Sequence, residues 1–568
     1  MTLAKRRGFF WNSNEIYGGS AGFYDYGPLG TRLECNLVDI WRDIFVIQEG
    51  YAEISTPVIT PEMVFSASGH LKEFTDLMVE CKKCSEPFRA DQLLTEHHPQ
   101  PDNLNAEEVN GMLTEFGIKC PVCGGALSEA YPFNLMFKTN IGPGSKRIGY
   151  LRPETAQGMF INFHLLYRYF REKIPFGVVQ IGRAFRNEIS PRQGMIRLRE
   201  FKMAELEYFI DPSDKSHPKY ERIKGLKIPL LPAGKPQEEA KPTTVAITLE
   251  EAIEKKILGS EVMAYFIGLT YEYLNSIGLS GPSLRFRQHG EKEKAHYAED
   301  CWDAEILTSF GWIECVGIAD RSCYDIERHN EYSGHTLAVT IHHEQPIERE
   351  VKKVIVDNKA LGKKFKALSV KIKAALEKLD GNKVADDGSP LKVNIDGKDY
   401  EIDRDCFEVK TVTEKEFGKK IIPHVIEPSF GLDRITFALI ENSYYERESS
   451  YRVLRFKPQV APINAGVFPL MAKPELVEVT QKCIENLKNM KLNIFYDDSG
   501  SIGRRYARMD EAGTPFCVTI DYDSLKDNTV TIRERDSTDQ VRIKIANLPK
   551  ILNDLIEEKL IFKEIKAA

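Results

Sequence analysis

Apolar residues recur with helical spacing in a segment near the N-terminus. From Gly27 the chain reads GPLGTRLECNLVDIWRDIFV. The apolar positions of this stretch are Leu33, Leu37, Ile40, Trp41, Ile44 and Phe45. Their spacing, with Pro28 at the first helical position, predicts a helix. The following YAEISTPVI predicts a strand, which Pro57 confines to a sheet edge or a strand end because proline has no N–H to donate.

Further patterns divide the rest of the chain. Residues 177–209 predict two strands joined by a loop, and 421–441 predict a strand, a turn and a helix. Between about 345 and 420, Lys-rich helical stretches alternate with short polar strands, which resembles a small appended module without an evident role. From Val460 onward, short apolar strands alternate with helical patterns. That alternation predicts a separate α/β domain at about 458–568.

Composition and charge narrow the class of protein. The 568 residues, 42% hydrophobic and 28% charged, suffice for roughly three domains of about 150–200 residues. No run approaches the ~18 apolar residues of a bilayer-spanning helix, and the N-terminus lacks the apolar stretch of a signal peptide. We therefore expect a cytoplasmic protein without a membrane partner. A net charge of -7 excludes an indiscriminately basic nucleic-acid coat and leaves room for local patches.

Four of the eleven cysteines form two close pairs. Cys81, Cys84, Cys120 and Cys123 give the spacing C-x2-C-x35-C-x2-C. In a reducing compartment this spacing favours a metal over disulfides, and four thiolates suit a closed tetrahedral Zn²⁺. The alternative is a set of free thiols. Because an all-cysteine site leaves no open coordination position, we expect a structural zinc without a catalytic role.

Charged residues gather on one face of the predicted hairpin. With 197–209 as a strand, alternation places Arg197, Arg199, Phe201, Met203, Glu205 and Glu207 on one side. Arg186 and Glu188 likewise share a face in the preceding strand. An unpaired buried charge is very costly, so these groups need partners. Internal ion pairs on a solvated face and a ligand site both satisfy that need.

The segment HVIEPSFGLDRITFALI carries an arginine at a predicted helix start. Gly431 stands where the strand turns into the helix, which places Arg434 in the first helical turn. A cation there opposes the helix dipole by about 0.3–1 kcal/mol unless an anion lies beside it. Helix N-termini also bind phosphates, so the pattern indicates a nucleotide. The alternative is an exposed Arg434, or one paired with Asp433.

Together these segments resemble the three signature motifs of class II aminoacyl-tRNA synthetases. The motifs are a Pro-containing helix and strand that form a dimer interface, an FRNE-loop-RxREF hairpin, and a strand and helix with Gly-Leu-x-Arg. Most of the chain resembles the dimeric glycyl-tRNA synthetases, through FWNSNEIYGG, YDYGPLG, YLRPETAQG, FRNEISPR, EFKMAELEYF, EPSFGLDR, GTPFCVT and TVTIRERD. The chain has no GxxxxGK[ST], HIGH or KMSKS string, which disfavours a P-loop NTPase or a class I synthetase.

The resemblance implies a fold and a domain order. The fold is α/β (α+β), a class II antiparallel sheet flanked by helices, with zinc-bearing and helical insertions and a C-terminal α/β anticodon-binding domain. The first part of the catalytic core is expected over 1–344, with a zinc-ribbon-like insertion at about 78–130 and another insertion at about 211–290. The module at 345–420 follows it. The core then ends at 421–457, and the anticodon-binding domain covers 458–568. It also implies a homodimer.

The resemblance further implies an ATP site. Its expected residues are Arg186, Asn187, Glu188, Arg197, Leu198, Phe201, Glu314, Cys315 and Arg434. Arg186 is expected at the α-phosphate and Arg434 at the γ-phosphate, with Glu314 as a Mg²⁺ ligand. Arg186, Glu188 and Arg434 are the expected catalytic residues.

The expected partners are ATP, glycine and tRNA(Gly). The glycine pocket is implied at Arg89, Glu154, Glu205, Glu427 and Ser429. Arg89 would face the glycine carboxylate, and Glu154 and Glu205 would hold the ammonium. For His70, in SASGHLKEF, the alternatives are a loop residue of the pocket and a polar surface residue, and we favour the second. Since glycine is the smallest amino acid, a pocket excludes its competitors by bulk, and no editing domain is needed.

Five arginines of the tail are the expected contacts with the anticodon. Arg504, Arg505 and Arg508 cluster in GSIGRRYARMDEAGTPF, and Arg533 and Arg535 alternate in TIRERD, which places both on one strand face. Guanidinium planes stack on splayed bases and bind their edges. The alternative for each is a surface arginine beside acidic residues.

Two other functions compete with the enzyme. A catalytically inactive, synthetase-like accessory protein that binds nucleic acid should have lost its phosphate-binding arginines, whereas Arg186 and Arg434 are both present. A zinc-ribbon nucleic-acid-binding module, in which the sheet is purely structural, leaves the charged hairpin face unexplained.

Overall fold

The computed structural model describes residues 2–566 apart from 99–100, 102–103, 145, 192, 234–243, 291–292, 295–297, 380, 382–383, 385–388, 396 and 448–450. The chain forms two compact units, one of Met1–Leu337 with Ile422–Ala568 and one of Ala338–Ile421. Among the described helices, none is long and apolar enough to cross a membrane.

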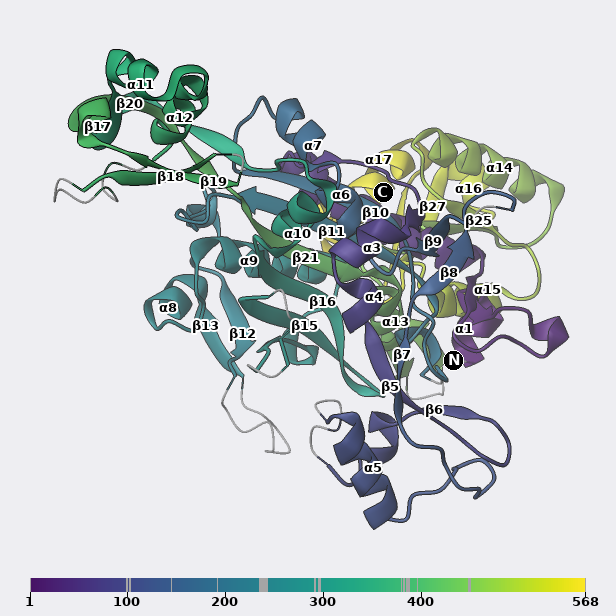
Figure 1. The fold of residues 1–568 in the computed structure, drawn as a ribbon. Coiled ribbons are helices and arrows are strands. Elements are labelled where there is room, and N and C mark those ends of the chain that lie inside the picture. The colour runs from purple at the N-terminus through teal and green to yellow at the C-terminus, as the bar shows by residue number, and fades with distance from the viewer. Residues whose placement is uncertain are drawn as a thin grey trace. The chain divides into compact units, whose positions relative to one another are not determined.

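A nine-stranded sheet forms the centre of the first unit (Figure 1). Its order is β13 (Val245–Thr248), β12 (Lys227–Leu231), β14 (Leu284–Gln288), β15 (Asp300–Thr308), β16 (Gly311–Ser322), β21 (His424–Gly431), β11 (Glu200–Ile210), β10 (Phe176–Phe185) and β3 (Ala52–Glu53). Neighbouring strands are antiparallel except for the pairs β12–β14 and β10–β3. The predicted antiparallel-rich α/β fold is therefore confirmed.

The predicted N-terminal helix is present as α2 (Pro28–Arg42), continued by a π-helical turn, η2 (Asp43–Gln48). Its apolar stripe faces the core, because Leu33, Leu37 and Trp41 are fully buried. The Trp41 ring stacks on Phe45 at 4.5 Å between centroids, and Phe430 of β21 lies 5.8 Å from Trp41 and 5.2 Å from Phe45. This aromatic contact fixes the helix against the strand that carries EPS. Helix α9 (Glu261–Ile277) supplies much of the same core.

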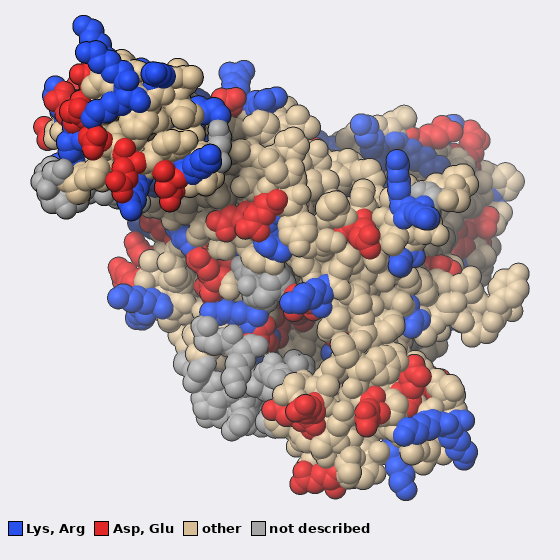
Figure 2. Space-filling view, in the orientation of Figure 1, with Lys and Arg blue, Asp and Glu red and all other residues tan. Residues whose placement is uncertain are grey.

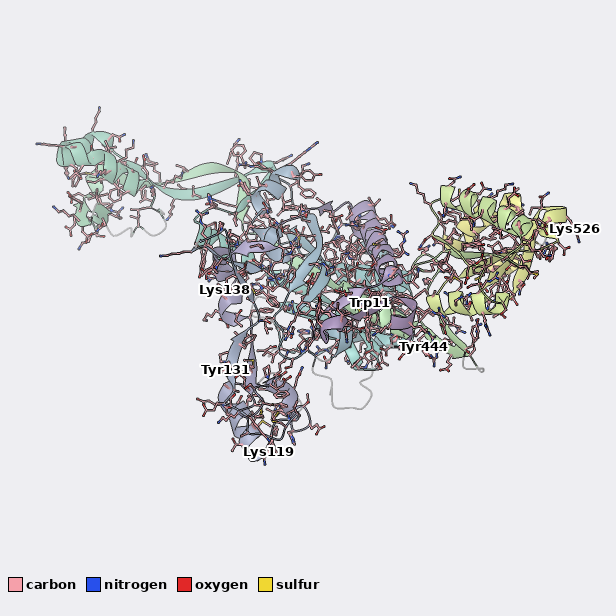
Figure 3. All side chains as sticks on the ribbon, turned by 90° about the vertical axis from the view of Figure 1, so that its right-hand side faces the viewer. Trp11, Lys119, Tyr131, Lys138, Tyr444 and Lys526 are labelled. Carbon is pink, nitrogen blue, oxygen red and sulfur yellow. The ribbon has the colours of Figure 1, made fainter. Side chains whose placement is uncertain are left out.

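A small module carries the cysteines. It has a three-stranded sheet of β6 (Pro87–Arg89), β5 (Thr75–Glu80) and β7 (Tyr131–Asn134), with helix α5 (Ala106–Glu115). Asn105 and Glu108 form a capping box at the start of α5, which satisfies otherwise unpaired N–H groups. Figure 3 labels Lys119 and Tyr131 in this module. Its apolar core is limited to a few side chains such as Val79, Leu94 and Val109, and Cys81 and Cys120 are buried in it, while Cys84 is exposed.

The C-terminal part forms the predicted α/β domain around a five-stranded sheet. Its order is β25 (Ile494–Tyr496), β24 (Ala465–Pro469), β26 (Phe516–Ile520), β27 (Thr529–Glu534) and β28 (Gln540–Lys544). The first three strands are parallel and the last two antiparallel. Helices α14 (Pro474–Asn489) and α17 (Leu548–Ile556) complete its core with buried leucines and isoleucines, while α15 (Ile502–Ala512) packs Met509 and Ala512 into a second, smaller cluster. Asn36 of α2 donates to the carbonyls of Val460 and Ala461, each at 3.0 Å.

The second unit pairs β17 (Val339–Val356) with β20 (Phe407–Ile421) and carries a hairpin of β18 (Leu391–Ile395) and β19 (Lys398–Ile402). Helices α11 (Asn358–Phe365) and α12 (Ser369–Leu376) bury Leu361, Ile372 and Leu376 in its own small core. These helices and the hairpin lie where the Lys-rich and short polar patterns predicted them. Basic and acidic side chains are interspersed on the face of this unit that Figure 2 shows.

Candidate active site

A cavity of about 310 Å³ lies among the strands of the nine-stranded sheet. Twelve of the residues expected to bind ATP or glycine line it: Glu154, Arg186, Glu188, Arg197, Leu198, Phe201, Glu205, Glu314, Cys315, Glu427, Ser429 and Arg434. They come from segments far apart in sequence, brought together because β11 pairs with β10 and β21, and β21 pairs with β16. Its volume is at the lower end of the range for small-molecule sites.

One end of the cavity is acidic. Glu205, on β11, is 2% exposed. It accepts hydrogen bonds from the Thr155 backbone N–H at 2.6 Å, the Thr155 hydroxyl and the Ser429 hydroxyl at 2.8 Å. Burial, and next the charge of Glu154, raise the pKa of Glu205. A cation that enters beside a buried carboxyl of this kind stabilises the ionised form of the carboxyl.

A buried arginine organises the other two carboxylates of this acidic end. Arg321, 1% exposed, donates to both oxygens of Glu427 at 3.0 and 2.9 Å and to Asp325 at 2.8 Å. It also lies 3.7 Å from Glu154. Burial acts to raise the pKa of Glu154, but His70 and Arg321 together hold it below its ordinary value. Arg321 therefore orients the carboxylates while leaving the group as a whole acidic.

Sequence reasoning favoured the wrong alternative for one residue here and missed another. His70 is not at the surface, since its side chain is 10% exposed; it does not line the cavity, but its Nε2 lies 3.5 Å from Glu154, which does. Arg321 was not singled out at all, because the string ADRS has no local feature that marks a buried ligand of distant carboxylates. Below them, Glu207 is fully buried, and neither carboxyl oxygen has a hydrogen-bond partner among the described residues. Burial, and next the charge of Glu427, raise its pKa well above the ordinary value.

The other end of the cavity is rich in arginine. The Arg186 guanidinium lies between the rings of Phe74 and Phe201, 5.3 Å from each centroid, and its Nε donates to Pro153 O at 3.3 Å. Cation–π contacts on both sides hold the planar group in place. The planar guanidinium of Arg186 is therefore held next to two aromatic rings. Such an environment suits a ligand that carries a flat ring, such as a nucleotide base.

Arg434 lies in the first turn of α13 (Leu432–Asn442), as predicted. Its Nε donates to Ile196 O at 3.0 Å, and its Nη1 donates to the Glu314 carbonyl at 2.9 Å and carboxylate at 3.1 Å. The alternative partner Asp433 instead accepts from the Tyr26 hydroxyl at 2.6 Å and the Lys202 N–H at 2.5 Å. The anion that offsets the helix dipole is thus Glu314, whose side chain is 49% exposed toward the cavity.

Two buried charged atoms at this end lack partners. Glu188 Oε2 and Arg197 Nη1 make no hydrogen bond with a described residue, although Arg197 Nε is 3.8 Å from Glu188 Oε2. Buried polar atoms in folded proteins are nearly always hydrogen-bonded, so orphaned atoms call for an explanation. A bound polar ligand would supply the missing partners. This observation favours a ligand site over internal ion pairs on the hairpin face.

Three expected residues are placed differently. Arg89 does not line the cavity, and its guanidinium is paired with Asp76 at 2.9 Å and Asp91 at 2.6 Å. Asn187 also lies outside the lining, where its N–H donates to Leu135 O at 2.7 Å. Arg199 precedes β11, which begins at Glu200, and unlike Arg197 it does not line the cavity, so the prediction that Arg199 shares the charged face is wrong. Its guanidinium binds the carbonyls of Glu188 and Ala21 instead.

Comparisons with known proteins agree with this geometry. The tRNA synthetase class II core domain (G, H, P, S and T) matches residues 141–229, and the anticodon binding domain matches 459–555. The chain is 50% identical to the glycine–tRNA ligase of Methanothrix thermoacetophila over 567 residues, 99% of this chain and 97% of the relative. It is 48% identical to that of Methanocaldococcus jannaschii over 570 residues, 98% of each. The chain belongs to the glycine–tRNA ligase family.

Membership of the glycine–tRNA ligase family fixes the class of reaction. The protein is a class II aminoacyl-tRNA synthetase, an ATP-dependent ligase with ATP, glycine and tRNA(Gly) as substrates. The alternative of an inactive accessory protein is not favoured, because relatives named as ligases match nearly the whole chain and the arginines of the cavity are present. A purely structural sheet is likewise disfavoured by the orphaned charges of the pocket.

The four cysteines of this glycine–tRNA ligase family member converge as the spacing predicted. Cys81 Sγ lies 3.4 Å from Cys123 Sγ, and Cys84 Sγ lies 3.7 Å from Cys120 Sγ. A tetrahedron of sulfurs about 2.3 Å from a zinc ion has S···S distances of about 3.8 Å, so the group fits a metal. N–H groups of Cys84 and Lys83 donate to Cys81 Sγ at 3.5 and 3.4 Å. The Cys84 N–H is the main cause that lowers the pKa of Cys81 to about 6, which favours the thiolate that binds metal.

The tail arginines divide into two groups. Arg505, Arg533 and Arg535 are at most 6% exposed. Arg505 donates to backbone carbonyls, Arg533 binds both oxygens of Asp510, and Arg535 donates to the carbonyls of Gly513 and Phe456. The prediction that they offer free guanidinium groups to tRNA is wrong, since internal acceptors occupy them. Arg508 is bound to Asp497 and remains partly exposed, while Arg504 is exposed.

Proposed function

We propose that this cavity forms glycyl-adenylate from glycine and ATP, with the ammonium in the acidic end and the phosphates at the arginine-rich end. The observation that carries the proposal is the pairing of these two ends in one cavity: buried Glu205, Glu427 and Glu154 at one, Arg186 and Arg434 at the other. A bound glycine ammonium would satisfy carboxylates whose burial is otherwise costly. The small cavity also supports exclusion of larger amino acids by bulk.

The proposed reaction needs positioning more than acid–base catalysis. The glycine carboxylate is ionised at neutral pH, so one of its oxygens attacks the α-phosphorus without a general base. An O–P bond forms as the bond to pyrophosphate breaks, and negative charge moves onto the leaving phosphates. Arg186 and Arg434, held by fixed contacts, would stabilise that charge. A ribose hydroxyl at the tRNA 3′ end then attacks the adenylate carbonyl, and AMP leaves.

Glu314 would serve as the Mg²⁺ ligand in this proposal. Its carboxylate opens into the cavity and its partner there is Arg434, at 3.1 Å. When bound, Mg²⁺ neutralises charge on the ATP phosphates. Phosphates that approach Arg434 would compete for its guanidinium, which would free the Glu314 carboxylate to act as a hard oxygen ligand.

Amino-acid-dependent exchange of pyrophosphate into ATP tests the proposed activation step. Run against all twenty amino acids, the exchange should depend on glycine alone. Exchange with alanine or serine at a comparable kcat/KM would contradict exclusion by bulk, and the absence of any exchange would contradict the assignment of the cavity.

Glu205→Gln is expected to raise the glycine KM by at least about tenfold, because a charge-assisted hydrogen bond to the ammonium is replaced by a neutral one. The ATP KM should change little. The matched control is Glu200→Gln on the same strand, since Glu200 pairs with Arg183 and does not line the cavity. A raised ATP KM with an unchanged glycine KM would instead assign Glu205 to the nucleotide.

The cysteine cluster is proposed to hold one structural Zn²⁺ per chain. The sulfur distances and the small apolar core of the module support this, because four thiolates around a metal would add the stability that the core does not supply. Gly125 supports it too, since a Cβ there would lie 3.0 Å from Cys81 Sγ and 3.3 Å from Cys123 Sγ.

Cys120→Ser should lower the zinc content below one ion per chain and lower the unfolding temperature, because the module loses its metal. Metal analysis and thermal unfolding measure the two effects. Cys35→Ser is the control, since Cys35 is a free cysteine outside the cluster. Substoichiometric zinc in the unaltered protein, with an unchanged unfolding temperature in Cys120→Ser, would show that the cysteines are simply free thiols.

Arg504 and Arg508 remain the proposed tRNA contacts of the C-terminal domain. Arg504→Glu should raise the tRNA KM several-fold, because an exposed cation near RNA phosphates becomes a repelling anion, and should leave pyrophosphate exchange unchanged. Lys482→Glu, an exposed reversal elsewhere in the domain, controls for charge alone. An equal effect of both changes on the tRNA KM would contradict a local role of Arg504.

We also propose a homodimer that works in the cytoplasm, where its three substrates occur together. The expected interface is the segment from Gly27 to Pro57, where Ile47 is 72% exposed. Leu165 and Tyr169 on the helix α7 (Phe163–Tyr169), four residues apart, are further exposed apolar side chains that an interface would cover. Sedimentation equilibrium tests this proposal against the 64.7 kDa mass of one chain.

A further inference from the structure

A second group of metal-ligating side chains lies in the cavity wall, apart from the cysteine module. His289 directly follows β14, and Cys301 and Asp303 are two residues apart on the neighbouring strand β15. One ligand atom from each lies within 4.8 Å of the other two. The backbone N–H of His289 donates to the backbone carbonyl of Cys301 at 2.9 Å, which fixes the two residues opposite each other. All three line the same cavity.

The contacts of this group leave an imidazole nitrogen unexplained. His289 Nε2 is 2.7 Å from the Asp303 carboxylate, but Nδ1 is buried without a hydrogen-bond partner among the described residues. Asp303 is 4% exposed. Arg287 also contacts Asp303, at 3.2 Å, yet the same guanidinium binds Glu305 at 3.0 Å and Glu293 at 2.9 Å. Because Arg287 has these two other carboxylate partners, Asp303 can bind another cation while Arg287 stays paired.

Another group of possible metal ligands in the chain already has a cation from the protein itself. Glu299, Asp320 and His424 also lie within 4.8 Å of one another. There the ammonium of Lys215 binds Glu299 at 3.0 Å and Asp320 at 2.6 Å, so a side chain of the protein already supplies the cation. Among the described contacts of His289, Cys301 and Asp303 there is no lysine; the cation that the protein supplies is Arg287, whose contact with Asp303, at 3.2 Å, is longer than either contact of Lys215.

We infer that His289, Cys301 and Asp303 form a second metal site, open to the cavity, for a transition-metal dication of the Zn²⁺ type. Imidazole nitrogen and thiolate sulfur favour Zn²⁺ or Co²⁺ over Mg²⁺, which prefers oxygen ligands. Three protein ligands leave a fourth position for water or a ligand, unlike the closed set of four cysteines. That position faces the cavity, because all three side chains line it. Binding releases the Cys301 thiol proton to solvent, since a metal-bound thiol is deprotonated.

Cobalt is the probe for this site, because thiolate ligation of Co²⁺ gives a charge-transfer absorption. The full-length protein, with the metal of its cysteine cluster retained, is dialysed against Co²⁺ and its metals are counted. We expect one additional cobalt ion per chain, with thiolate absorption and with no release of zinc. Excess Mg²⁺ should leave the cobalt bound. No additional cobalt, or its displacement by Mg²⁺, overturns the inference.

Variants assign the ligands. Cys301→Ser should abolish the thiolate absorption, and His289→Gln should weaken cobalt binding by at least about tenfold. Cys35→Ser, at a cysteine outside both metal groups, should leave both unchanged. Thiolate absorption that persists in Cys301→Ser would show that cobalt had entered the cysteine cluster, which contradicts the site. The ion count on the unaltered protein stays decisive even where a variant does not fold.

Discussion

Arg434→Ala is expected to reduce glycine-dependent pyrophosphate exchange by about 10²–10³-fold, a loss of roughly 3–4 kcal/mol of transition-state stabilisation. The side chain is fixed by Ile196 O and Glu314, so its positive charge needs no reorganisation when the phosphates arrive. Arg186→Ala should have an effect of similar size, because its guanidinium is held between Phe74 and Phe201 at the same end of the cavity. Exchange kinetics at saturating glycine measure both.

Arg183→Ala is the matched control for these two variants. Arg183 lies on β10, the strand that directly precedes Arg186. Its side chain is 59% exposed and pairs with Glu200 outside the cavity. Arg434→Lys adds a second comparison, since it keeps the charge and loses the planar fork that matches a phosphate. Near-normal exchange in both alanine variants would show that the nucleotide does not bind at this end.

Local patterns in the sequence sufficed to predict the elements that build the cavity. The four-residue spacing of Leu33, Leu37 and Trp41 identifies α2 because helical periodicity is a property of neighbouring residues. The turn at Gly431 likewise identifies the first turn of α13 and the place of Arg434. Which strands become neighbours is not contained in such patterns. The resemblance to class II synthetases supplied that step.

The contacts that could not be predicted join residues that are far apart in the sequence. Arg321 and Glu427 are 106 residues apart, and Tyr26 reaches Asp433 across 407. His70, at the start of the short helix α4 (His70–Glu73), contacts Glu154 across 84 residues of sequence. A helix of four residues is too short to show an apolar periodicity that would reveal burial, so the surface was favoured for His70. The same reasoning failed for the tail, where alternation identifies the face of a strand but not whether that face is buried.

Asp510→Ala is expected to destabilise the C-terminal domain by about 3–5 kcal/mol, because it leaves a buried arginine charge without its partner. Asp510 is fully buried and accepts two hydrogen bonds from Arg533, each at 2.9 Å, and Arg447 lies 3.5 Å away. Urea unfolding should be followed by circular dichroism, since none of the four tryptophans lies in this domain. Glu478→Ala is the control, because its pair with Lys482 is exposed and should contribute at most about 0.5 kcal/mol.

Arg533→Ala then separates the structural role of this arginine from the tRNA contact that the sequence suggested. As the partner of Asp510, Arg533 should also give a large loss of stability, because buried Asp510 would keep only the longer contact with Arg447, at 3.5 Å. As a tRNA contact, it would instead raise the tRNA KM while the urea midpoint stayed unchanged. A tRNA effect without a stability effect would contradict the buried ion pair. Restored stability in the double variant Asp510→Ala/Arg533→Met, which removes both charges together, would support it.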